Sequence, residues 1–128
     1  MEISDQEFDQ LISRAMDELP KRDIENLNNV VVTYADVPDP YQIAKLKLRG
    51  DSLLLGLYEG IPLTKRGSGY NLVLPDKITL FKLPIATYAS QRGSSVYEEI
   101  RHTLWHEIAH FYGLNHTDIH SKEGGFRA

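Results

Sequence analysis

The sequence predicts an α+β fold, in which a small mixed β-sheet packs on an N-terminal helix and a C-terminal helix. Three observations support this prediction. Apolar residues recur at helical spacing across residues 4–19. Three apolar runs in the middle of the chain are typical of strands. A second helical pattern covers about residues 95–112 and holds three of the five histidines.

The composition is that of a globular domain without thiolate ligands. The chain has 128 residues, of which 41% are hydrophobic and 25% are charged, enough for one domain with a real core. There is no cysteine, so a bound transition metal would have to rely on histidine and carboxylate ligands. The net charge of −4 favours neither nucleic acid nor an anionic membrane as a partner.

The chain carries no sign of a targeting or membrane segment. The N-terminal stretch "MEISDQEFDQ" is acidic and lacks the apolar segment of a secretory signal. The longest apolar run, "LLLGLY", is too short to cross a bilayer. We therefore expect a soluble, cytoplasmic protein.

Residues 4–19 carry the marks of a complete helix. Ser4 and Glu7 have the spacing of a capping box, and Pro20 ends the helix. Its apolar stripe, typical of a helix packed on a sheet, consists of Phe8, Leu11, Ile12, Ala15, Met16 and Leu19. The next segment, "KRDIENLNN", is compatible with one more helical turn.

Three segments predict strands. "NVVVTYADV" is apolar and β-branched, and "KITLFKLPI" is the clearest strand, which we expect to end at Pro84. "DSLLLGLYEGIP" contains Gly56 and Gly60, which mark bulges or close approaches, and Pro62 limits it. We expect an extended peptide to add to the edge of either "LLGLYEG" or "KITLF", and the loop from Leu63 to Asn71 to border this edge.

The connections are less regular. "PDPYQIAKLKLRG" predicts a loop with a short helix. "LTKRGSGYNLVLPD" predicts a long connection of the kind that is often functional, although a flexible hairpin loop fits it equally well. No repeat or linker divides the chain, so we expect one domain over residues 1–128, with residues 117–128 as a flexible tail.

The C-terminal helix begins and ends with recognisable signals. Ser95 and Glu98 form a second capping box, and Gly113 can adopt the left-handed conformation that ends a helix. Glu99, His102 and Thr103 are expected to point in the same general direction as the later histidines. The opposite face is apolar and consists of Ile100, Leu104, Ile108 and Phe111.

A group of histidines on this helix predicts a metal site. His106 and His110 are one helical turn apart and project from one face, and His116 returns after the turn at Gly113. Three protein ligands leave a fourth position for water, as in catalytic zinc sites. Glu107 lies beside this position and could hold the water. We expect His102 to be a supporting or solvated residue and His120 to belong to the tail.

These residues form the pattern "HEIAHFYGLNH", which resembles the zincin metallopeptidase signature in its longer, metzincin form. The whole chain resembles the small bacterial zincin-like metallopeptidases, or minimal zincins, through "DELP", "NVVV", "LLGLYEGIPL" and "LPDKITLF". The resemblance implies a zincin-like catalytic core that binds Zn²⁺ through His106, His110 and His116. It also implies that Glu107 is the general base.

Two departures from these families affect the expected site. Minimal zincins often have aspartate as the last ligand, where this chain has His116, and Asp118 follows two residues later. We favour His116 because it keeps the motif spacing. Metzincins have a methionine-containing turn after the third ligand, whereas the only methionines here are Met1 and Met16. We therefore expect the chain to lack the C-terminal subdomain of metzincins. With only the sheet and the active-site helix to form the walls, the cleft should be wide and shallow.

Three functions are compatible with the sequence. The first is a zinc-dependent metallopeptidase acting on a peptide or protein substrate, with Tyr70, Arg66 or Tyr112 as the candidate oxyanion stabiliser. The second is a zinc-bearing module that binds a peptide without turnover. The third is an RNA-processing metallohydrolase, whose related motif has glycine where this chain has Glu107; the acidic net charge also disfavours RNA.

Overall fold

The computed structural model describes residues 2–47, 53–70 and 74–114. Within them the chain forms a sheet of order β1-β3-β2, made of β1 (Val30–Ala35), β2 (Gly56–Glu59) and β3 (Asp76–Phe81). β1 runs parallel to β3 and β2 runs antiparallel to it. The mixed sheet and the α+β class are as the sequence predicted.

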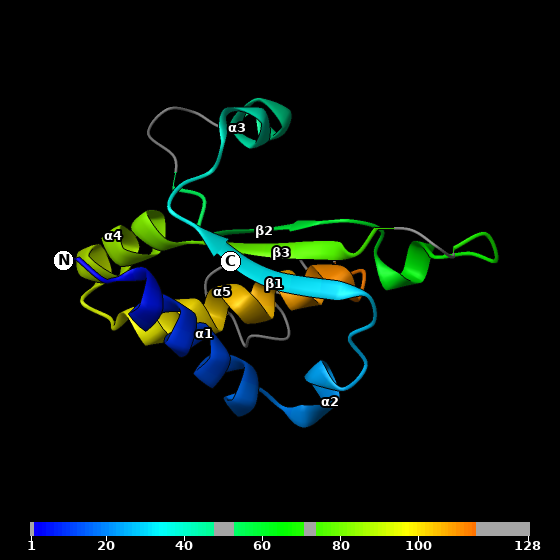
Figure 1. Cartoon of the computed structure of the whole chain (residues 1–128), viewed down its shortest axis with the longest axis horizontal. Coiled ribbons are helices and arrows are strands. Elements are labelled where there is room, and N and C mark those ends of the chain that lie inside the picture. Colours follow the sequence, from blue (N-terminus) through cyan, green and yellow to red (C-terminus); the bar gives the residue numbers. More distant parts are fainter. Residues whose placement is uncertain (1, 48–52, 71–73, 115–128) are drawn as a thin grey trace.

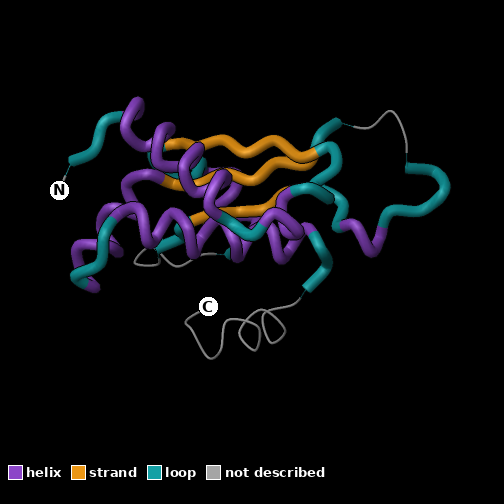
Figure 2. The backbone as a smooth tube through the Cα atoms, turned by 90° about the horizontal axis from the view of Figure 1, so that it is seen from below, coloured by secondary structure: helices purple, strands orange, loops and turns teal. Residues whose placement is uncertain are grey.

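Helices lie on both sides of this sheet (Figure 1). α1 (Asp5–Glu18) and α5 (Val96–Phe111) cover one face, and α3 (Pro40–Leu46) lies on the other side. α2 (Lys21–Ile24) follows α1, a short 3₁₀ turn η1 (Leu63–Lys65) follows β2, and α4 (Lys82–Arg92) links β3 to α5. Seen from below, α1 and α5 lie in front of the strands (Figure 2).

Both predicted capping boxes are present. Ser4 and Ser95 each accept a hydrogen bond from the backbone of the third helical residue, and the glutamate there bonds back to the cap. In the second box, hydrogen bonds from Ser95 stabilise the charged form of Glu98 and hold the pKa of its carboxyl below the usual value. The starts of α1 and α5 are therefore determined by local sequence.

The hydrophobic core lies between the sheet and the two long helices. α1 contributes Phe8, whose ring packs edge to face on the ring of Tyr34 in β1, with the two ring centroids 5.7 Å apart. The remaining fully or nearly fully buried members of this core include Ile12, Ala15, Ile78, Leu80, Ile85, Ile100, Leu104 and Ile108. The apolar face predicted for the C-terminal helix is thus the one that packs on the sheet.

Two sequence predictions need correction. The strand expected to run to Pro84 ends at Phe81, and α4, which we did not predict, begins at Lys82. Pro84 lies in the first turn of α4, where a missing N–H removes no hydrogen bond of the helix. The strand expected within "DSLLLGLYEGIP" is also shorter, since β2 has four residues.

None of the described helices is long and apolar enough to cross a membrane.

Candidate metal centre

α5 places two imidazoles side by side. His106 and His110 are one turn apart, their ring centroids are 4.9 Å apart and their planes meet at 69°. Both rings are half-buried and line the same cavity, of about 570 Å³. This is the arrangement that two histidine ligands of one metal ion need.

Glu107 is buried beside these histidines. Its side chain is 7% exposed, and it lines the same cavity. Burial raises the pKa of Glu107 to about 8, while a hydrogen bond from the backbone of Tyr58 partly opposes the shift. The carboxyl therefore lies against β2, where one backbone amide of the strand orients it.

The backbone of β2 explains how this amide becomes available. The amide of Phe81 donates to the carbonyl of Leu55 at 2.9 Å. Since hydrogen-bonded and non-hydrogen-bonded pairs alternate in an antiparallel ladder, the polar groups of Gly56 and Tyr58 point away from β3. Among the described strands, β2 thus lies at an edge of the sheet, as predicted for "LLGLYEG". The alternative edge on "KITLF" is excluded, because β3 lies between β1 and β2.

α5 and β2 approach each other closely at Gly56. A β-carbon on this residue would lie 2.6 Å from Cγ2 of Thr103 and 3.3 Å from Cγ of Glu107. Glycine is therefore required here for the approach between strand and helix, as expected for glycine within a strand.

The end of α5 is fixed by Gly113, as the sequence predicted. Gly113 has a φ of 87°, its amide donates to His110 at 2.9 Å, and the amide of Leu114 donates to Ala109 at 3.1 Å. These two bonds form a Schellman motif. A β-carbon at Gly113 would also lie 2.9 Å from Cγ2 of Thr64. The turn that leads towards residue 116 is therefore packed against the segment after β2.

The predicted third ligand, His116, and its competitor Asp118 lie outside the described residues, as do His120 and the tail 117–128. Within the described ranges, no three His, Asp or Glu side chains come together as a metal-binding group. The described part of the site thus consists of His106, His110 and the adjacent carboxyl of Glu107. Two imidazoles and an orienting carboxylate fit a zinc site that takes its third ligand from the following segment.

The comparison with known families decides the family of this chain. The family model of zincin-like metallopeptidases matches residues 27–126. The chain belongs to this family. Membership implies zinc binding, hydrolase chemistry and peptide substrates. No curated protein sequence matches the chain.

Glu99 and His102, expected to point in the same general direction as the later histidines, are not among the described residues that line the cavity of His106 and His110. His102 lines a separate hollow of about 910 Å³ together with Trp105 and Tyr112. Glu99 is fully buried, accepts a hydrogen bond from Ser94 at 2.5 Å and pairs with Arg92 at 3.4 Å. Thr103, by contrast, does point towards β2 at Gly56. The larger hollow is distinct from the candidate metal centre, since neither His106 nor Glu107 lines it.

The three candidate oxyanion stabilisers are engaged in other contacts. Tyr112 donates its hydroxyl hydrogen to the carbonyl of Asp23 at 2.7 Å. The Tyr70 hydroxyl accepts from Asn29 at 3.0 Å, and Arg66 forms an ion pair with Asp76. None of the three candidates is among the described residues that line the zincin-like cavity.

Sequence reasoning found part of the cavity walls, since the "LLGLYEG" strand and the loop from Leu63 to Asn71 were expected to border the cleft. Besides the motif residues, the walls consist of Leu46, Leu54, Gly56, Leu57, Tyr58, Pro62, Thr64 and Lys65. Gly56 gave a signal, as a glycine within a predicted strand. Thr64 and Lys65 lie in the loop from Leu63 to Asn71, whereas Leu46 and Pro62 gave no signal, because their place depends on how the connections fold back towards α5.

Proposed function

We propose that this zincin-like chain is a zinc-dependent peptidase in which Glu107 is the general base. His106, His110 and His116 would hold the metal, which, when bound, makes hydroxide available near neutral pH and polarises the scissile carbonyl. Glu107 takes a proton from the attacking water and passes it to the leaving amine. The open edge of β2 binds the peptide in extended form.

The observation that carries this proposal is the position of Glu107. Its carboxyl is buried between the histidine-bearing turn of α5 and the edge of β2, and it lines the cavity that both histidines line. A site that only stabilised the fold would have no use for an unligated carboxylate beside an open metal position. A binding module without turnover is therefore the less favoured alternative.

Zinc analysis of purified variants tests the ligand set. We expect one zinc per chain in the wild type and loss of zinc in His106→Ala, His110→Ala and His116→Ala. His102→Ala is the matched control, because His102 lies one turn earlier on α5 and lines a different hollow. Asp118→Ala should also keep zinc. If His116→Ala keeps zinc and Asp118→Ala loses it, Asp118 rather than His116 is the third ligand.

A further inference from the structure

We propose that Arg66 and Asp76 are positioning residues, which hold residues 61–65 as a wall of the peptide-binding cavity. This inference rests on the proposed peptidase function. Neither residue is among the described residues that line the cavity, so neither is proposed to touch the substrate. Their role is to fix the parts that do line it.

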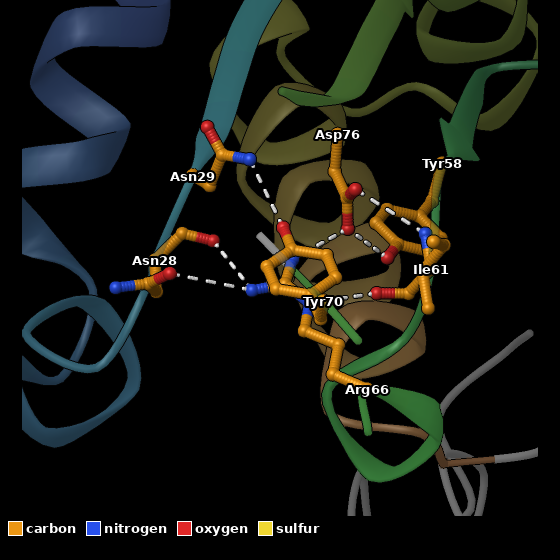
Figure 3. Close-up of polar contacts among 7 residues, drawn as sticks. All are labelled: Asn28, Asn29, Tyr58, Ile61, Arg66, Tyr70 and Asp76. Atoms are coloured by element: carbon orange, nitrogen blue, oxygen red, sulfur yellow. Dashed lines mark hydrogen bonds and ion pairs between the residues drawn. The ribbon is translucent and has the colours of Figure 1, made fainter. Parts of the chain in front are cut away.

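Asp76, the first residue of β3, is the centre of a buried polar network (Figure 3). Its side chain is 3% exposed and accepts hydrogen bonds from the Tyr58 hydroxyl, from the Ile61 amide at 3.2 Å and from Arg66 at 2.8 Å. Burial and the Asp76 carboxylate raise the pKa of Tyr58, so its phenol remains a donor. Gly60 leaves the space for this carboxylate, because a β-carbon there would overlap it.

All three guanidinium nitrogens of Arg66 donate hydrogen bonds within this network. Besides the pair with Asp76, it donates to the carbonyls of Asn28 and Ile61, each at 3.0 Å. Its guanidinium carbon lies 4.3 Å from the ring centroid of Tyr70 and 4.9 Å from that of Phe111 at the end of α5. With a side chain 7% exposed, Arg66 joins the loop after β2 to the start of β1 and to α5.

The loop has little apolar burial of its own. Ile61 is 42% exposed and Leu63 is 40% exposed, while Thr64 and Lys65 are also exposed. A segment that buries so little apolar surface gains little from the hydrophobic effect. The polar contacts of Arg66 are therefore the main attachment of this wall within the described residues.

The network reaches the proposed catalytic centre through two short paths. Tyr58 bonds Asp76 through its hydroxyl and orients Glu107 through its backbone. Thr64, two residues before Arg66, packs against Gly113 at the end of α5. Loss of the Arg66–Asp76 ion pair should therefore increase the mobility of residues 61–65. The positions of the histidines on α5 should stay unchanged.

The test compares Arg66→Met, Arg66→Lys and the double variant Arg66→Met/Asp76→Asn with the wild type. Arg92→Met is the matched control, since Arg92 also pairs with a buried carboxylate, Glu99, but at the other end of α5. Hydrogen–deuterium exchange of residues 57–66 is measured on each protein, together with zinc content. KM and kcat are measured for a fluorogenic peptide that the wild type cleaves, well below the unfolding temperature.

We expect faster exchange across residues 57–66 in Arg66→Met and partial recovery in Arg66→Lys. We expect KM to rise about tenfold or more in Arg66→Met, with kcat within about threefold and zinc retained. The double variant should regain stability without regaining KM, because it removes the unpaired charge but not the need for the wall. Arg92→Met should change neither exchange at 57–66 nor KM.

Unchanged exchange in Arg66→Met would overturn the proposal, and so would a loss of stability with KM unchanged. Because the exchange measurement does not depend on turnover, it remains decisive if the wild type cleaves no peptide. In that case the peptidase function fails, while the attachment of the wall is still tested.

Discussion

Gly56 is a residue at which β2 and α5 approach each other closely beside the candidate site. Its α-carbon leaves room for the methyl group of Thr103 and for the side chain of Glu107. Any side chain at this position has to push β2 away from α5, and with it the Tyr58 amide that orients Glu107.

We predict that Gly56→Ala destabilises the protein by about 1–3 kcal/mol, the usual cost of overpacking a well-packed contact. Peptidase activity should fall with it. Gly67→Ala is the control, because a β-carbon at Gly67 meets nothing within 4 Å. Chemical denaturation and peptide cleavage are the measurements.

A second substitution distinguishes overpacking from other causes. Thr103→Ser removes the Cγ2 atom that lies 2.6 Å from the added β-carbon. The double variant Gly56→Ala/Thr103→Ser should therefore recover part of the lost stability, which is a coupling expected only between residues in contact. Strictly additive losses would show that the Thr103 contact is not the cause.

Individual site residues differ in how well the sequence predicts them. The spacing of His106 and His110 predicted their placement on one helical face, because the geometry of a single helix suffices for it. Arg66 was instead a candidate oxyanion stabiliser, and its true partner is Asp76. That pair lies ten residues apart across an irregular loop, and no local pattern predicts such a contact.

The C-terminal end of α5 is an element on which the proposed metal site depends. Gly113 combines a left-handed conformation with a close contact to Thr64. Gly93, which ends α4, has a φ of 71° but meets nothing within 4 Å. Alanine at Gly93 therefore introduces backbone strain alone, whereas alanine at Gly113 introduces backbone strain and a clash with Thr64.

We predict that Gly93→Ala and Gly113→Ala both lower stability, by about 1–2 kcal/mol for the left-handed alanine. Only Gly113→Ala should also weaken zinc binding, because it displaces the turn after His110 from Thr64. Competition with a metallochromic chelator measures the zinc affinity of each variant. Equal zinc affinities in the two variants would show that the turn at Gly113 does not contribute to zinc binding.

α4 shows why one helix escaped prediction. Proline is a frequent end signal for a strand, and Pro84 follows the best strand pattern in the chain. The same proline is acceptable in the first turn of a helix, so the signal had two interpretations. The buried residues Ile85, Ala86 and Ala89 complete the helical pattern only once the helix is assumed.

At the level of the whole molecule, the core consists of apolar side chains rather than of the candidate metal ligands. α1, α5 and the sheet pack through apolar side chains, with Phe8, Ile78 and Leu104 fully buried. The α+β class was predictable because each of these elements has a clear periodic pattern. The order β1-β3-β2 was not, since strand neighbours are chosen by long-range packing.

We predict that a chelator removes zinc without unfolding the protein. Circular dichroism should retain the helical signal, while the melting temperature falls because a ligand that binds only the folded state stabilises it. At a free zinc concentration about 100 times Kd this stabilisation is about 2.7 kcal/mol. Loss of the helical signal on zinc removal would show that the metal is part of the fold.

The most direct test of the peptidase function is a peptide-library digest with the zinc-loaded wild type and with Glu107→Gln. Glutamine has nearly the size of glutamate and can hydrogen-bond a water, but it cannot accept the proton. Since general acid–base groups contribute about 10²–10⁴-fold to rate, cleavage should fall by at least about 100-fold while zinc content and melting behaviour are kept. Cleavage by Glu107→Gln at the wild-type rate would contradict the role of Glu107 as the base. Zinc binding by both proteins with no cleavage by either would favour the binding module.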